Sequence, residues 1–326
     1  MADDTAPSRD TWLIYRGSGE PHDGILGLPE PPPWRRLDQR RTGADRARTY
    51  QIGPGEVDVV NAALRLRRPL LVTGKPGTGK SSLADSIAHE LKLGPVLRWH
   101  ITSRSSLADG LYSYDAIGRL HEAGLRSGQA SDELDIGRYI RLGPLGTALL
   151  PHDKPRVLLI DELDKSDIDL PNDLLSVFED GEFRVRELER LPEEQSAVDV
   201  FTTDPGSSAQ IRRGWVTCRA FPVVVITSNG ERQFPPPFLR RCLRLDLKQP
   251  GREKLAAIVT AHMGPDALAR SEPLIDAFLD LADRGDVATD QLLNAVYLTA
   301  SGGQTPDELR EKLAEVLLRP LSAAGA

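Results

Sequence analysis

The sequence predicts an α/β protein with a parallel, doubly wound five-stranded sheet, followed by a small all-α domain. Apolar strand-like runs alternate with helical patterns up to about residue 250, and this alternation is typical of a parallel sheet covered by helices. A glycine-rich stretch separates the first such strand from the first helix after it. Residues 251–326 contain only helical patterns, broken at glycines, which predicts a separate helical domain.

Three parts are expected along the 326 residues: an N-terminal extension over 1–48, the α/β domain over 49–250 and the helical domain over 251–326. The extension joins a proline-rich run ending at Trp34 to an arginine-rich stretch. The arginines of this second stretch are Arg35, Arg36, Arg40, Arg41, Arg46 and Arg48. Because it lacks helical or strand periodicity, it is interpreted as a solvated linker, or as a contact with a neighbouring subunit or an acidic partner.

Each expected element has its own apolar pattern. The strands of the α/β domain are expected near 69–73, 97–102, 157–161, 222–228 and 243–247. Its helices include 171–179, which stops near Gly181, and 80–93, whose apolar face comprises Leu83, Ala84, Ile87, Ala88 and Leu91. The helical domain is expected to contain helices 252–263, 273–283, 289–301 and 306–318. The long, mixed segment 182–215 is interpreted as an inserted hairpin and loop.

The composition is that of an ordinary globular protein, with 40% hydrophobic and 27% charged residues and a net charge of −7. The acidic balance argues against a dedicated nucleic-acid binder. Cys218 and Cys242 form no C-x-x-C motif, and no pair among the six histidines has metal-ligand spacing. The acidic N-terminus lacks a signal-peptide core, and no apolar run is long enough to cross a bilayer. A cytoplasmic protein without a membrane contact is expected.

The glycine-rich stretch is Gly-Lys-Pro-Gly-Thr-Gly-Lys-Ser at residues 74–81, which matches the phosphate-binding pattern G-x-x-x-x-G-K-[ST]. In this pattern backbone N–H groups surround a phosphate, the lysine reaches the β/γ-phosphates and the hydroxyl holds Mg²⁺. The strand before it and the helix after it point the helix N-terminus at the anion. The alternative is a plain turn before a helix. Nucleotide-binding residues are therefore expected to be Gly74, Lys75, Pro76, Gly77, Thr78, Gly79, Lys80, Ser81 and Ser82.

Two acids, Asp161 and Glu162, end the apolar run 157–160 about 80 residues later. Asp161 is positioned to hold Mg²⁺ beside Ser81, and Glu162 to orient or deprotonate an attacking water. The alternative is that both acids only end a strand at an exposed turn.

The run 222–228 ends at Asn229, whose amide could contact a γ-phosphate or the lytic water; alternatively, Asn229 only begins a turn. Arg240 and Arg241 precede the last strand. A guanidinium there could reach the γ-phosphate, and such an arginine finger can come from a neighbouring subunit. A surface arginine pair is the alternative.

In this order, the motifs resemble those of an AAA+ ATPase over residues 50–320. The stretches 159–165, 172–175, 179–183 and 238–242 are similar to the MoxR-like branch of bacterial AAA+ proteins. The resemblance implies ATP and Mg²⁺ as ligands and hydrolysis of ATP. Lys80 would then bind phosphate, Ser81 would bind Mg²⁺, Asp161 and Glu162 would form the Walker B motif, and Asn229 would be sensor 1. Arg241 is the better finger candidate, and Arg240 is the alternative.

The same resemblance implies a hexameric ring that acts as a chaperone-like remodeler of a protein client, with partners that carry a von Willebrand factor A domain. One departure is that 288–291 carries no sensor 2 arginine, so that Gln291 or Arg284 is left to fill this role. Leu111-Tyr112-Ser113-Tyr114 is interpreted either as a pore loop that grips polypeptide or as packing residues.

An ATP-hydrolysing ring motor is therefore the leading hypothesis. A nucleotide-gated scaffold with little turnover is the second, favoured by the missing sensor 2 arginine and opposed by Asp161, Glu162 and Asn229. A nucleic-acid motor is disfavoured by the acidic balance. A GTPase would need an Asn-Lys-x-Asp base reader, which is absent, and a small-molecule kinase would leave Glu162 and the helical domain unexplained.

Overall fold

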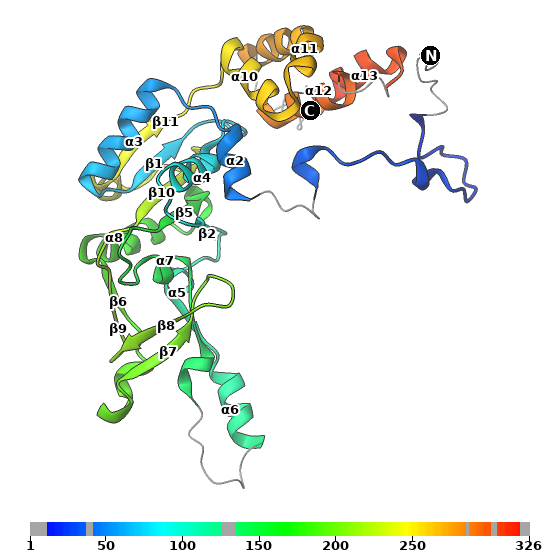
Figure 1. The fold of residues 1–326 in the computed structure, drawn as a ribbon. Helices are drawn as coiled ribbons and strands as arrows, with labels where there is room; N and C mark the ends of the chain where they lie inside the picture. The colour runs from blue at the N-terminus through cyan, green and yellow to red at the C-terminus, as the bar shows by residue number, and fades with distance from the viewer. Residues whose placement is uncertain (1–11, 37–41, 126–134, 285–286, 301–304, 320–326) are drawn as a thin grey trace. The chain divides into compact units, whose positions relative to one another are not determined.

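The computed structural model describes residues 12–36, 42–125, 135–284, 287–300 and 305–319 (Figure 1). The chain divides into two compact units. The α/β unit comprises Ile52–Thr73 and Lys80–Leu247. The helical unit comprises Lys248–Ala326 together with Met1–Gln51 and the glycine-rich loop Gly74–Gly79.

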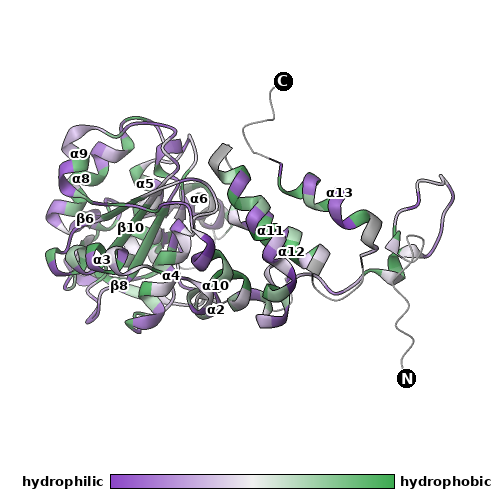
Figure 2. Cartoon of the chain, turned by 90° about the horizontal axis from the view of Figure 1, so that it is seen from above, coloured by the Kyte–Doolittle hydropathy of each residue, from purple (hydrophilic) through white to green (hydrophobic). Residues whose placement is uncertain are grey.

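The centre of the α/β unit is a sheet of five parallel strands in the order β11-β1-β10-β5-β2. The strands are β1 (Leu70–Thr73), β2 (Leu97–His100), β5 (Val157–Asp161), β10 (Val223–Ser228) and β11 (Leu243–Asp246). The first four residues of β5 are each 0% exposed, as expected for a strand covered on both faces, and the apolar strands of this sheet are coloured green in Figure 2. The predicted parallel five-stranded sheet is confirmed.

Helices cover this sheet and join its strands. They include α3 (Pro54–Leu66), α4 (Lys80–Glu90), α8 (Leu170–Asp180) and α9 (Pro236–Arg241). Helix α4 packs on β5 and β10 through the buried residues Leu83, Ala84, Ile87 and Ala88. Leu91 was expected on the same face, but it follows the end of α4 and is 44% exposed. Helix α8 ends at Gly181 in the left-handed conformation (φ 65°), as the sequence predicts.

A second sheet of six strands has the order β3-β4-β7-β8-β9-β6. Its strands are β3 (Tyr112–Tyr114), β4 (Ile140–Leu142), β6 (Glu182–Arg184), β7 (Ala197–Phe201), β8 (Ser208–Arg212) and β9 (Trp215–Thr217). The hairpin expected within 182–215 is present as β7 and β8, but these strands belong to a larger sheet that was not predicted. Four of the strands have only three residues, so pairing between distant segments stabilises them rather than local propensity.

Short helical segments flank β3 and β4. They are α5 (Leu107–Leu111), α6 (Ala116–Leu125), the 3-10 helix η3 (Ile136–Tyr139) and α7 (Pro144–Ala148). Tyr112 of β3 stacks on Phe183 with ring centroids 6.4 Å apart, and its hydroxyl accepts a hydrogen bond from the Arg186 backbone at 3.2 Å. The Tyr114 hydroxyl accepts one from Arg119 at 3.2 Å. Both tyrosines are partly buried, and these contacts favour the packing interpretation over the pore loop.

The helical unit contains α10 (Arg252–Met263), α11 (Pro265–Arg284), α12 (Thr289–Ala300) and α13 (Asp307–Leu317). The expected start of α11 at residue 273 is wrong by two turns. Proline is well tolerated at the first helical position, so Pro265 opens the helix, and Pro273 is accommodated in its interior. The core of the unit comprises Leu255, Val259, Ile275, Phe278, Leu292 and Val296. No helix within the described ranges is long and apolar enough to span a bilayer.

Part of the N-terminal extension packs on this helical core. The Trp34 indole donates a hydrogen bond to Asn294 Oδ1 at 3.1 Å and makes edge contacts with His262 and Tyr297. The Tyr297 hydroxyl donates to the Glu30 carbonyl at 2.7 Å. The solvated-linker interpretation is therefore wrong for residues 30–34, which are held by their own chain.

The arginine-rich stretch is also more ordered than a linker. Residues Gly43–Thr49 form helix α2, which is closed at its start by a capping box between Thr42 and Asp45 and contacts α10. Such a box satisfies the free N–H groups of the first turn, which is why a segment without apolar periodicity still forms a helix. Arg36 pairs with Glu30 at 2.6 Å, whereas Arg40 and Arg41 lie outside the described residues.

Candidate functional site

The loop Gly74–Gly79 links the carboxyl end of β1 to the first turn of α4. Gly74, Gly77 and Gly79 have φ values of 146°, 76° and 88°, a region in which glycine alone is unstrained. A Cβ at Gly77 would also lie 2.7 Å from the Thr289 backbone nitrogen and 2.8 Å from the Ala288 Cβ. The glycines of the motif are thus required both by the turn and by the close approach of the start of α12.

Tyr50, the residue directly after α2, was not predicted as part of this region. Its ring lies 3.0 Å from the position of a Cβ at Gly79, so it packs directly on the glycine-rich loop. An aromatic residue shortly before a helix is too common a pattern to indicate this role from sequence.

The side chain of Gln291, one candidate for the sensor 2 role, makes hydrogen bonds within the helical unit. Its Oε1 accepts a hydrogen bond from the Ala288 backbone at 2.8 Å, and its Nε2 donates to the carbonyls of Leu317 and Arg319 at 3.1 and 2.8 Å. The side chain therefore caps α12 and ties it to the end of α13. The side chain of Arg284, the other candidate, lies outside the described part of the chain.

Ser81, in the first turn of α4, faces the end of β5. Its hydroxyl donates a hydrogen bond to Asp161 Oδ1 at 2.6 Å, and His100 Nδ1 at the end of β2 lies 3.5 Å from Asp161 Oδ2. A hydroxyl and a carboxylate are hard oxygen ligands of the kind that Mg²⁺ takes beside substrate phosphates. No group of three or more His, Cys, Asp or Glu side chains in the described ranges is arranged to hold a metal by itself.

Lys80 is the last residue of the motif's G-K pair, and it is 8% exposed. Burial lowers its pKa, while the carboxylates of Asp164, Asp161 and Glu162 act in the opposite direction. The lysine is thus placed in a partly desolvated, acidic environment, where its interaction with an anion is stronger than in bulk water. Ser82, the next residue but one, is partly buried in the same turn.

Glu162 directly follows β5 in the left-handed conformation, with φ 62° and ψ 47°. Its backbone N–H donates to Thr227 Oγ1 at 2.8 Å, and its carboxylate accepts a hydrogen bond from Lys165 Nζ at 2.7 Å, which raises the pKa of Lys165. A non-glycine residue with positive φ is uncommon and needs support from its surroundings. The strained turn directs this glutamate differently from Asp161.

Asn229 follows β10, the strand next to β5 in the sheet. Its backbone N–H and that of Glu231 both donate to Asp164 Oδ2 at 3.0 Å. The structure thus brings the Asn229 loop and the Glu162 loop together, as neighbouring parallel strands require. Thr227 and Asp164 were not predicted; the only available signal was their position, two residues before Asn229 and two after Glu162.

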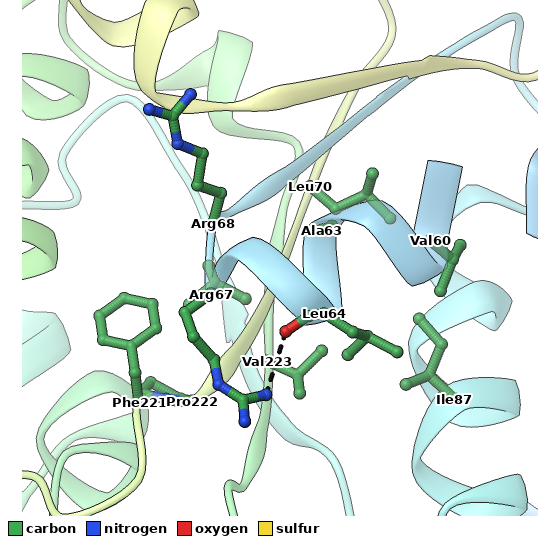
Figure 3. A pocket seen from close by; sticks show the side chains of 11 residues that line it. Val60, Ala63, Leu64, Arg67, Arg68, Leu70, Ile87, Phe221, Pro222 and Val223 are labelled. Atoms are coloured by element: carbon green, nitrogen blue, oxygen red, sulfur yellow. Dashed lines mark hydrogen bonds between the residues drawn. The ribbon is translucent and has the colours of Figure 1, made fainter. Parts of the chain in front are cut away.

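An open cavity of about 610 Å³ adjoins these two loops. It is lined by Ile101, Thr102, Ser103, Glu162, Asp164, Lys165, Glu231 and Arg232. A second, apolar pocket lies at the amino-terminal ends of β1 and β10, where Arg67 donates to the Leu64 carbonyl at 3.0 Å (Figure 3). Its free volume of about 10 Å³ holds one water at most. Of these two spaces, only the first is large enough for a ligand.

Arg240 and Arg241 end helix α9, far along the chain from the glycine-rich loop. The Arg241 Nε donates to the carboxylate of Glu179 on α8, and its Nη1 lies 3.4 Å from the Pro237 carbonyl. Arg240 is exposed, and its guanidinium makes no hydrogen bond or ion pair with the described residues, whereas its carbonyl accepts from Arg68 at 3.3 Å. Neither arginine approaches the chain's own Glu162 through a hydrogen bond.

Two crystal structures of NtrX from Brucella abortus, one in complex with ADP and one with ATP, are similar to this chain at 16% identity. The matches cover 86% and 85% of this chain and 58% and 60% of the NtrX chains, with TM-scores of 0.38 and 0.40. This chain thus spans less than two thirds of the NtrX chains. No curated protein matches the sequence.

The sequence also matches the family described as AAA domain (dynein-related subfamily) over residues 69–242. The match runs from the start of β1 through the glycine-rich loop, the acids after β5 and Asn229 to the residue after Arg241. It covers more than half of the chain and contains the whole second sheet and four of the five strands of the first, because β11 follows its end. The chain therefore belongs to the AAA domain family, in its dynein-related subfamily.

Proposed function

We propose that this protein binds ATP with Mg²⁺ and hydrolyses it to ADP and phosphate. The observation that carries the proposal is the cluster at the carboxyl ends of β5 and β10, in which Asp161 accepts hydrogen bonds from Ser81 and Thr227 while Glu162 follows in a strained turn. A structural strand end needs neither a buried hydroxyl on the acid nor a glutamate with positive φ.

The roles follow from the chemistry of each group. Backbone N–H groups of 74–79 and the ammonium of Lys80 bind the phosphates, while Ser81 and Asp161 hold Mg²⁺, which supplies neutralisation of the charge on the phosphate oxygens. Glu162 accepts a proton from the attacking water or orients it, and Asn229 positions this water or the γ-phosphate. Glu162 and Lys165 form an ion pair. The Glu162 carboxylate must therefore break this pair before it can bind the attacking water.

We propose further that the active site is completed by a neighbouring subunit in a ring of six copies, the assembly that the resemblance to MoxR-like proteins implies. Support comes from Arg240 and Arg241, whose guanidinium groups are partly or fully exposed and form no hydrogen bond or ion pair with the chain's own Glu162. The ring would remodel a protein client in the manner of a chaperone, and its proposed partners are proteins with a von Willebrand factor A domain. A cytoplasmic location is part of the same proposal.

A nucleotide-gated scaffold with little turnover is the second candidate. Two observations favour it: Gln291 is occupied by capping and tethering contacts rather than free for a phosphate, and Glu162 is paired with Lys165. In this case ATP would change the assembly state without being consumed.

ATP turnover by the wild type, Glu162→Gln and a control, Glu90→Gln, decides between the two. Glu90 is an exposed residue at the end of α4, so its variant tests for a general effect of losing a carboxylate. The motor hypothesis expects Glu162→Gln to bind ATP normally and hydrolyse it at least about a hundredfold more slowly. Turnover in Glu162→Gln equal to that of Glu90→Gln refutes the assignment of Glu162, and ATP-dependent assembly without turnover in the wild type establishes the scaffold.

A further inference from the structure

Two sets of side-chain hydrogen bonds, called ties below, link the loops that follow β5 and β10, and each set comes from the opposite segment. In the first, a side chain of β10 holds the backbone after β5. In the second, a side chain after β5 holds the backbone after β10. All the residues involved lie in the α/β unit.

Thr227 makes the first tie. Its hydroxyl, on a residue that is 1% exposed, donates to Asp161 Oδ1 at 2.7 Å and accepts from the Glu162 N–H at 2.8 Å. A hydroxyl can donate one bond and accept others at the same time, which a valine of the same shape cannot do. Thr227 therefore holds the orientation of the Asp161 carboxylate and the left-handed backbone of Glu162 together.

Asp164 makes the second tie. The carboxyl is on a residue that is 3% exposed, and one of its oxygens accepts the N–H groups of Asn229 and Glu231, both at 3.0 Å. A buried carboxylate is retained only when hydrogen bonds or charges compensate for its lost hydration. Here two backbone donors at Oδ2 and the nearby ammonium of Lys80 compensate, whereas the buried Oδ1 makes no hydrogen bond with the described residues. The loop that carries Asn229 is fixed by the two bonds to Oδ2.

From these contacts we propose that Thr227 and Asp164 are positioning residues that couple the Glu162 loop to the Asn229 loop, so that a shift of one loop shifts the other. The inference rests on the proposed ATP hydrolysis for its functional meaning, since Asn229 would contact the γ-phosphate region and Glu162 the attacking water. The presence of a γ-phosphate at Asn229 would thereby set the position of Glu162. Neither positioning residue touches the reacting atoms.

The variants isolate the groups that make the ties. Thr227→Val removes the hydroxyl at constant shape, and Thr227→Ser restores it. Asp164→Ala removes both acceptor oxygens, and Asp164→Asn keeps one of them if the alanine variant does not fold. Thr202→Val is the matched control, because Thr202 is a buried threonine directly after β7 whose hydroxyl bonds only to the backbone carbonyls of Asp204 and Ser207 among the described residues.

Hydrogen exchange of single amides is the first readout, and it does not depend on turnover. Thr227→Val is expected to speed the exchange of Glu162, and also of Asn229 and Glu231, whose own acceptor is untouched. Asp164→Ala is expected to speed the exchange of Asn229 and Glu231, and also of Glu162. Acceleration confined to the amides that lose their acceptor would overturn the coupling, whatever the protein hydrolyses.

Steady-state ATP hydrolysis is the second readout. Thr227→Val and Asp164→Ala are expected to lower kcat roughly tenfold to a hundredfold with KM changed less than about twofold, and Thr227→Ser and Thr202→Val to stay near wild type. If the wild type hydrolyses ATP and both variants match it, the coupling is wrong although the proposed function stands. If the wild type does not hydrolyse ATP, the proposed function fails, and the exchange pattern alone decides whether the loops are coupled.

Discussion

Arg241 donates a hydrogen bond from its Nε to the carboxylate of Glu179, 62 positions earlier in the chain, on helix α8. The two side chains are 40% and 54% exposed, and an ion pair at such a surface contributes less than about 1 kcal/mol. The guanidinium is therefore held in place by a partner that it can exchange for a more highly charged anion, such as the γ-phosphate on a neighbouring subunit.

The first prediction is that Arg241→Ala and Glu162→Gln complement each other. Each variant alone should hydrolyse ATP at least about a hundredfold more slowly than the wild type. When the two are mixed and allowed to exchange subunits, sites form that combine Glu162 of one chain with Arg241 of its neighbour, and turnover should rise well above that of either variant. Turnover is measured as a function of the mixing ratio.

Arg240→Ala is the control for this assignment. The Arg240 guanidinium is exposed and has no hydrogen-bond or ion-pair partner among the described residues. If Arg240→Ala is inactive and complements Glu162→Gln while Arg241→Ala keeps its turnover, the finger is Arg240. If neither arginine variant loses turnover, a finger supplied by α9 is ruled out.

The second prediction concerns the contact of the N-terminal extension with the helical unit. Trp34→Ala removes the hydrogen bond to Asn294 and the edge contacts with His262 and Tyr297. We expect this to destabilise the helical unit by about 1–3 kcal/mol and to release the segment around Arg35 and Arg36, so that trypsin cleaves there faster. Thermal unfolding and the rate of cleavage at these arginines measure the effect.

Tyr15→Ala is the matched control, because Tyr15 is an aromatic residue of the same extension that is 84% exposed. Its variant should unfold and be cleaved as the wild type. Equal cleavage rates in Trp34→Ala and Tyr15→Ala would mean that the extension is not held by Trp34.

The parts of the site that could be predicted are those whose chemistry is local in the sequence. The glycines of 74–79 have positive φ because the turn demands it. Asp161 ends, and Glu162 follows, an apolar run that is typical of a buried parallel strand. Parallel pairing then places all carboxyl ends of the strands at one edge, which is why Asn229 could be assigned to the same region from its position alone.

The parts that could not be predicted depend on contacts between distant segments. Thr227 and Asp164 are ordinary residues until β5 and β10 are known to be neighbours. Gln291 appeared free to contact a nucleotide because the carbonyls at Leu317 and Arg319 that it binds come from the end of α13. Strands of three residues such as β3 carry too little periodicity to be detected alone.

The third prediction is that Cys242 is unreactive in the folded protein. The residue is 8% exposed, and burial raises its pKa from 9.0 to about 12, so at pH 8 about one thiol in ten thousand is ionised. Iodoacetamide at pH 8 should therefore leave Cys242 unmodified for hours in the native protein and label it within minutes in denaturant. Mass spectrometry of a Cys218→Ser variant follows this residue alone, and rapid labelling of the native protein would contradict its burial.

The last prediction concerns acid stability and the ion pair between Arg156 and Asp204. The Arg156 Nη1 and Nη2 donate to the two carboxylate oxygens at 2.7 and 3.0 Å, and this bonding lowers the pKa of Asp204 below its usual 3.8, against the opposing effect of burial. In the pH range between the lowered pKa and 3.8, the unfolded state binds more protons than the folded state. The pair therefore stabilises the fold fully above pH 3.8, and this contribution is lost as the pH falls through the lowered pKa.

Asp204→Asn keeps one acceptor but removes the charge, so it should lower the free energy of unfolding by about 1–2 kcal/mol at pH 7. The difference between the wild type and this variant should shrink as the pH falls below 3.8. Denaturant unfolding at a series of pH values measures this difference. Asp153→Asn is the control, because Asp153 pairs with Arg219 at 87% exposure and its loss should change the free energy of unfolding by less than about 1 kcal/mol. A difference for Asp204→Asn that is constant or grows towards acid pH would mean that the pair does not stabilise the fold through the charge of Asp204.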